Sequence, residues 1–164
     1  MDLDREFQQG GGPVWDSSIY GSVALRGTFV KEEALLFGEN NSLVGILTHP
    51  SKTRRPQGLP AVVILNAGIM HRVGPNRLHV NIARTLAAEG FTTLRFDFSG
   101  VGDSKIRQDG LPFEKSALLE TREAMDCVCS RTDSKGAILM GMCSGATMAF
   151  QTACSDSRVV GAVL

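Results

Sequence analysis

The feature that most limits the fold of this chain is the segment Lys135 to Gln151, KGAILMGMCSGATMAFQ. Its first part, Ala137 to Met140, is a short and continuous apolar run, which is typical of a strand buried on both faces. Gly-Met-Cys-Ser-Gly follows at 141–145, and a helical pattern comes directly after it. The segment therefore predicts a strand, a tight turn and a helix in direct succession.

The two glycines of this turn indicate which side chain it exposes. A residue held at a tight strand-to-helix turn needs small neighbours two positions before and two after it, because larger side chains would collide with the backbone. Gly141 and Gly145 flank Cys143 in this way. Centring the turn on Ser144 would instead place Met142 where no side chain fits. The spacing favours Cys143 as an exposed nucleophile at the start of a helix, where free N–H groups favour a thiolate. The alternative is that Cys143 is a buried small apolar residue.

The rest of the chain alternates between predicted strands and helices. The expected elements are a strand pair at 33–37 and 43–48, strands at 61–65 and 91–98, helices at 75–89 and 113–131, and a last strand at 159–164. Gly-Glu-Asn-Asn between the first two strands indicates an antiparallel hairpin. This order predicts an α/β fold, a three-layer αβα sandwich with a mainly parallel sheet and an N-terminal antiparallel hairpin. The reactive site of such a sheet lies beyond the carboxyl ends of its strands.

The first thirty residues differ from the remainder. Residues 1–30 show no sustained periodicity and contain Gly-Gly-Gly-Pro at 10–13. We expect them to form a flexible or loosely packed N-terminal extension, and residues 31–164 to form one domain.

Residues 31–164 resemble the N-terminal part of the α/β-hydrolase superfamily. The G-x-C-x-G turn around Cys143 resembles the nucleophile elbow of that family. Its cysteine is similar to the one that dienelactone hydrolases use, and the chain also resembles the serine-aminopeptidase-like branch of the family. The stretch 66–69, Asn-Ala-Gly-Ile, stands where the family has its oxyanion turn, although the family's histidine is replaced. Residues 97–104 match the family's D-x-x-G-x-G-x-S loop. The resemblance implies that the backbone N–H groups of Ser144 and Ile69 stabilise an oxyanion.

The resemblance implies hydrolysis of an ester, thioester or lactone through Cys143, with a small acyl substrate and without a cofactor or metal. The family orders its triad as nucleophile, acid and histidine. No histidine follows Cys143, and Asp156 is the one acid after it, at a position unlike that of the family's acid. We therefore expect impaired catalysis. The alternative is a non-catalytic, truncated fragment or an interaction module completed by another chain.

The three histidines have simpler interpretations. His71 follows the oxyanion turn and could border the pocket, but a surface or loop-packing role is favoured. His49 and His79 are expected to be structural. Solvated ion pairs, rather than recognition of an anionic substrate, are expected for the scattered arginines Arg72, Arg77, Arg95 and Arg107. Gly100-x-Gly102 lacks the third glycine of a dinucleotide-binding loop, which disfavours a nucleotide-binding domain.

Composition narrows the class of partner. Lysine plus arginine and aspartate plus glutamate both number 17, so charge points neither to nucleic acid nor to a membrane surface. The uncharged run 136–155 could span a bilayer by length, but its glycines and change of period favour a strand and a helix. The four cysteines fit no zinc-binding spacing, and we expect them to be reduced in a cytoplasmic protein. An unpaired apolar edge at 159–164 predicts marginal stability or self-association.

Overall fold

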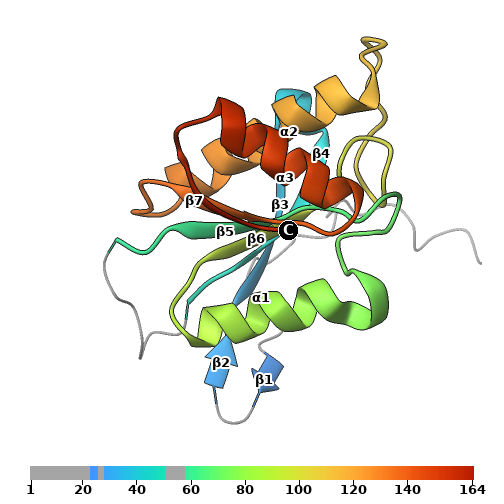
Figure 1. Cartoon of the computed structure of the whole chain (residues 1–164). Helices are drawn as coiled ribbons and strands as arrows, with labels where there is room; N and C mark the ends of the chain where they lie inside the picture. The colour runs from blue at the N-terminus through green and yellow to red at the C-terminus, as the bar shows by residue number, and fades with distance from the viewer. Residues whose placement is uncertain (1–22, 26–27, 51–57) are drawn as a thin grey trace, which may run out of the picture.

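The computed structural model describes residues 23–25, 28–50 and 58–164. Six of its strands form one sheet in the order β3-β4-β6-β5-β7-β8 (Figure 1). The strands are β3 (Glu32–Phe37), β4 (Leu43–Thr48), β5 (Ala61–Ile64), β6 (Thr93–Phe96), β7 (Ala137–Met140) and β8 (Val159–Val163). Strand β4 is antiparallel to β3 and β6, whereas β6, β5, β7 and β8 are parallel. This arrangement confirms the predicted fold class.

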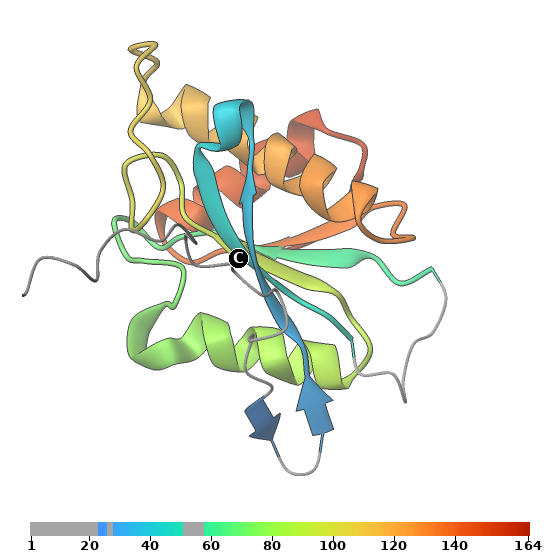
Figure 2. The same ribbon diagram turned by 180° about the vertical axis from the view of Figure 1, so that it is seen from behind.

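Helices cover both faces of the sheet. Helix α1 (Leu78–Ala88) lies on one face, and α2 (Phe113–Ser130) and α3 (Ser144–Ser155) lie together on the other (Figures 1 and 2). The molecule thus has the three layers expected from alternating strands and helices. Among the helices in the described part of the chain, none combines the length and the apolar character needed to cross a bilayer.

Strand β5 is apolar throughout because it contributes to two cores. Ala61 and Val63 pack in the larger core beneath α2 and α3. Val62 and Ile64 point the other way and pack with Ala83 of α1. Successive side chains of a strand face opposite sides, so a strand covered on both faces has no position for a solvated side chain.

The N-terminal region contains a hairpin that the sequence did not predict. Strands β1 (Val23–Leu25) and β2 (Thr28–Val30) pair antiparallel and form a separate two-stranded sheet. The glycine-rich stretch at 10–13 lies outside the described residues, and the boundary at residue 30 stays a prediction. The hairpin was missed because three-residue strands carry too little periodicity to stand out.

Helix α1 begins three residues later than expected. The sequence predicted a start at Pro75, but Pro75–Arg77 form a short 3-10 turn and α1 begins at Leu78. Asn76 and Arg77 have φ values of 47° and 61°. An α-helix requires negative φ, so these two residues delay its start. Strand β6 is also shorter than predicted, Thr93–Phe96 rather than 91–98.

Candidate active site

The turn between β7 and α3 places Cys143 at the surface. Cys143 has φ 54° and ψ −122°, and the helix begins at the next residue. A carbon added at Gly141 would lie 2.2 Å from the carbonyl carbon of Gly145. One added at Gly145 would lie 2.5 Å from the carbonyl oxygen of Asn66. Both glycines are therefore required by close backbone approach, and the turn between them exposes Cys143.

The loop after β5 lies against this turn. Gly68 has a φ of 59°, and its N–H donates a hydrogen bond of 2.8 Å to Oγ of Ser144. Within the part of the chain that the structure describes, the backbone N–H groups of Ile69 and Ser144 donate to no acceptor. Two free N–H groups from adjacent loops can bind an oxygen that gains negative charge.

Asn66 holds the same loop from the opposite side. Its side chain is buried and donates hydrogen bonds to the carbonyl oxygen of Met70 (2.7 Å) and to Oδ1 of Asp97 (3.1 Å). Its Oδ1 accepts the N–H of Phe98 at 2.8 Å. Sequence reasoning treated Asn66 only as part of a motif. A polar residue directly after a fully apolar strand was the signal that it needs buried partners.

In the loop after β6, Gly102 and Ser104 both contact Asp97, the residue with which the loop begins. Asp97 is fully buried, and a carbon added at Gly102, whose φ is 54°, would lie 2.3 Å from Asp97 Oδ2. Ser104 Oγ donates to the carbonyl oxygen of Asp97 at 2.6 Å and accepts the N–H of Val44 at 2.9 Å. The motif therefore builds a compact turn around Asp97 and joins it to β4.

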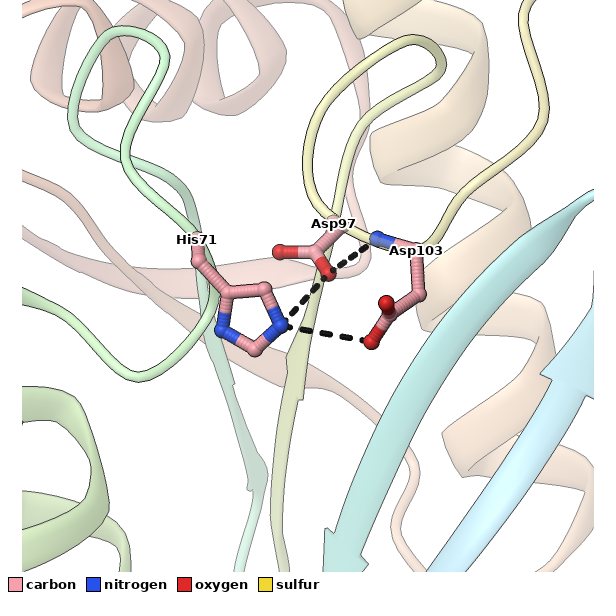
Figure 3. Close-up of side chains that lie close together, drawn as sticks. All are labelled: His71, Asp97 and Asp103. Atoms are coloured by element: carbon pink, nitrogen blue, oxygen red, sulfur yellow. Dashed lines mark hydrogen bonds and ion pairs between the residues drawn. The ribbon is translucent and has the colours of Figure 1, made fainter.

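His71, Asp97 and Asp103 lie close together beside this turn (Figure 3). Their ligand atoms lie within 4.8 Å of one another, a spacing that a metal ion could use. Arg72 already takes the place of a cation, since its guanidinium binds both Asp97 and Asp103. Hydrogen bonds from Arg72 and then from His71 lower the pKa of Asp103 below its ordinary value. The cluster is a paired electrostatic network, and sequence reasoning missed the part that Arg72 plays in it.

The structure brings no histidine to the thiol. His71 Nε2 lies 3.3 Å from Asp103, on the β6 side of the loop, whereas Cys143 follows β7 on the other side of β5. His49, which follows β4, contacts Glu33 of the edge strand β3, and His79 is buried at the start of α1. Burial, followed by the charge of Arg95, lowers the pKa of His79. Among the described residues, no imidazole or carboxylate hydrogen bonds to Cys143.

The remaining cysteines and arginines have structural surroundings. Burial raises the pKa of the thiols of Cys127 and Cys129, whereas Cys154 is exposed on α3. The arginines considered for anion recognition are mostly paired with carboxylates: Arg72 with Asp97, Arg95 with Glu32, and Arg107 with Asp109. The arginines are ion-paired, as expected, but they are largely buried rather than solvated: the side chains of Arg72, Arg95 and Arg107 are 11%, 7% and 17% exposed.

A hollow of about 400 Å³ lies away from the thiol, between the β3–β4 turn and the loop at 105–109. Arg107 in its wall binds Asp109 and also lies within 3.7 Å of Glu39. Its positive charge is thus neutralised by the protein itself. The hollow does not contact Cys143, so it is separate from the candidate site.

Comparison with known proteins agrees with this geometry. The family described as "alpha/beta hydrolase fold" matches residues 60–164, well over half of the chain. The chain therefore belongs to the α/β-hydrolase fold family. No curated protein matches the chain by sequence.

Solved structures share the fold at low identity. A hypothetical protein from Pseudomonas aeruginosa is 23% identical, with a TM-score of 0.68 over 81% of this chain and 41% of that one. An acetyl xylan esterase from Paenibacillus sp. R4 is 23% identical, with a TM-score of 0.67 over 87% of this chain and 50% of that one. A cold-adapted esterase from an Arctic intertidal metagenomic library is 17% identical, with a TM-score of 0.61 over 85% of this chain and 61% of that one. The chain spans less than two thirds of the length of each.

Proposed function

We propose that this chain carries the nucleophile and oxyanion site of an acyl hydrolase for esters, thioesters or lactones. The sulfur of Cys143 attacks the carbonyl carbon, a C–S bond forms, and the carbonyl oxygen becomes an oxyanion between the N–H groups of Ile69 and Ser144. The oxyanion collapses and expels the leaving group, and water then hydrolyses the acyl-cysteine. The observation that carries this proposal is the exposure of Cys143 at a left-handed turn beside two free backbone donors.

Two of the structural neighbours support this reaction class, because they are described as esterases. The surroundings of the thiol favour an uncharged acyl group. Ile69 is 92% exposed, and the exposed fractions of Met70 and Met142 are 37% and 39%. Arg72, which follows the loop after β5, is already bound to two carboxylates. An apolar acyl chain would bury this apolar surface. An anionic acyl group would find no unpaired arginine in the loop after β5, because Arg72 is already paired.

His49, His71 and His79 all have other surroundings, so no imidazole of this chain assists Cys143, and this favours slow turnover. Without a general base, the reaction forgoes a contribution of about 10²–10⁴-fold. The same observation favours a second candidate, a non-catalytic module that is completed by another chain.

The two candidates are separated by acylation of Cys143. We would incubate a Cys154→Ser variant with p-nitrophenyl acetate, because Cys154 is also exposed. The expected result is one equivalent of released nitrophenolate per chain, an acetyl group on the peptide that contains Cys143, and slow release of acetate. Iodoacetamide should likewise label Cys143 faster than the buried Cys127.

The control is the double variant Cys143→Ala, Cys154→Ser, which should release no burst of nitrophenolate. If acetylation is spread over lysines and other cysteines and Cys143→Ala does not change it, the proposal is wrong and the non-catalytic candidate is supported. A thiolate nucleophile must stay reduced, so the proposal includes a cytoplasmic location.

A further inference from the structure

The oxyanion turn, residues 66–70, is fixed from both neighbouring strand ends. On the β6 side, Asn66 donates to Asp97, and the backbone N–H of Arg72 donates to the same carboxylate. On the β7 side, the contact is the hydrogen bond of 2.8 Å from the Gly68 N–H to Ser144 Oγ. The loop thus joins the ends of three adjacent strands, β6, β5 and β7.

The bond on the β7 side is not required to fill space or to satisfy a deeply buried group. Gly68 is only half-buried, and a carbon added to it would meet no atom within 4 Å. Water could therefore solvate its N–H if the hydroxyl were absent. Ser144 is the first residue of α3, after the N-cap residue Cys143. Its Oγ accepts the N–H of Gly68, 76 residues away in the chain, so the bond links two separate elements.

From this arrangement we propose that the Ser144 hydroxyl is a positioning group for the oxyanion site. Ser144 supplies one proposed donor through its backbone N–H, and its side chain holds the peptide next to the other donor, Ile69. One residue thereby sets the separation between the two N–H groups. The inference rests on the proposed function, and it assigns a role to the side chain that is additional to the role of the backbone.

Two reactions of the same thiol test this role. Acetylation by p-nitrophenyl acetate passes through a tetrahedral oxyanion: the C–S bond forms, the oxyanion collapses and nitrophenolate leaves. Alkylation by iodoacetamide forms a C–S bond as iodide leaves, and no oxygen gains a full charge. A residue that positions the oxyanion donors should affect the first reaction and not the second.

The variants are Ser144→Ala and Ser144→Thr, both with Cys154→Ser. Loss of one donor altogether costs about 10²–10³-fold, so misplacing it should lower the acetylation rate of Ser144→Ala by about 10- to 100-fold. The alkylation rate should stay within about twofold of the parent chain. Ser144→Thr keeps the hydroxyl and should restore acetylation. Hydrogen exchange of the Gly68 amide should be faster in Ser144→Ala alone, and urea unfolding verifies that each variant is folded.

Each other result contradicts the inference in a recognisable way. Equal loss of both rates in Ser144→Ala would mean that the hydroxyl acts on the thiol, and unchanged rates would mean that it has no positioning role. Either result leaves the proposed function intact. Failure of the parent chain to acetylate at Cys143 would overturn the proposed function and this inference together.

Discussion

At the scale of single residues, two glycines determine which side chain the end of β7 presents. The space at Gly141 is closed by the backbone of Gly145, and the space at Gly145 is closed by the loop after β5. Neither contact involves a flexible side chain that could move aside. The turn, the start of α3 and the position of the loop after β5 therefore depend on these two missing side chains.

Gly141→Ala should consequently be severely destabilising. An added methyl carbon 2.2 Å from backbone atoms forces the turn apart, and we expect a loss of more than about 3 kcal/mol in the free energy of unfolding. Urea denaturation followed by circular dichroism measures this loss. Gly161→Ala in β8 is the matched control, since its added carbon would meet Ile138 at an ordinary 3.5 Å. Similar losses in both variants would show that close backbone approach is not the cause.

The residue scale also shows what sequence could and could not foresee. The spacing of Gly141 and Gly145 was enough to predict that the tight turn centres on Cys143, because the restriction is local. The bond from Gly68 to Ser144 and the burial of Asn66 against Asp97 could not be predicted, because each joins the ends of different strands. Such contacts depend on the sheet order, which sequence periodicity does not specify.

At the scale of elements, helix α1 is joined to the sheet by a shared carboxylate. Glu32 of β3 accepts from Arg84 of α1 at 2.6 Å and from Arg95 of β6 at 3.0 Å. Burial alone would raise the pKa of Glu32, but hydrogen bonds from Arg84 and Arg95 outweigh it and hold the pKa below the ordinary 4.5. The position of α1 beneath the sheet therefore depends on an ionised glutamate.

The ion triad predicts a dependence of stability on pH. A carboxyl group whose pKa is lower in the folded state contributes stability above pH 4.5, and this contribution is lost as the pH falls through the folded-state pKa. Glu32→Gln should cost about 1–3 kcal/mol at pH 7, because the buried Arg95 loses its charged hydrogen-bond partner. The variant should also lose less stability than the parent chain between about pH 5 and pH 3. Parallel pH profiles from urea unfolding would contradict this assignment.

The elements were predicted better than their ends. Strand β5 and helix α2 were foreseen nearly as they occur, because continuous apolar character and helical periodicity are strong signals. The start of α1 was placed at Pro75, which suits a first helical turn, but Asn76 and Arg77 adopt left-handed conformations. Nothing in the local sequence distinguishes these two possibilities.

At the scale of the whole molecule, the two edges of the sheet differ in protection. Edge strand β3 carries Glu32 and Glu33, whereas edge strand β8, Val159–Val163, carries no charged side chain. Within the described part of the chain, β8 pairs with β7 alone. Val160 and Val163 are 63% and 48% exposed. An apolar strand with unpaired backbone groups is a template for pairing with another strand.

We therefore propose that the chain self-associates through β8. Sedimentation velocity should detect species larger than the monomer that increase with protein concentration. Val160→Lys with Val163→Lys should shift the distribution to the monomer, because charges on an edge strand oppose pairing. Phe150→Lys removes an equally exposed apolar side chain from α3 and serves as the control. A monomeric parent chain, or dispersal by Phe150→Lys as well, would exclude β8 as the interface.

The left-handed backbone of Cys143 has a consequence for stability that opposes its proposed use. An L-residue at a φ of 54° and a ψ of −122° stores roughly 1–3 kcal/mol of backbone strain, which glycine would not incur. Cys143→Gly should then have a free energy of unfolding about 1 kcal/mol higher than that of Cys143→Ala. This difference already allows for the greater entropy of glycine in the unfolded state, and urea unfolding measures it. The reverse order would mean that the turn is relaxed. The conformation that exposes the thiol therefore lowers the stability of the folded chain. Strain of this kind is typical of functional sites and is not expected at a turn with a structural role alone.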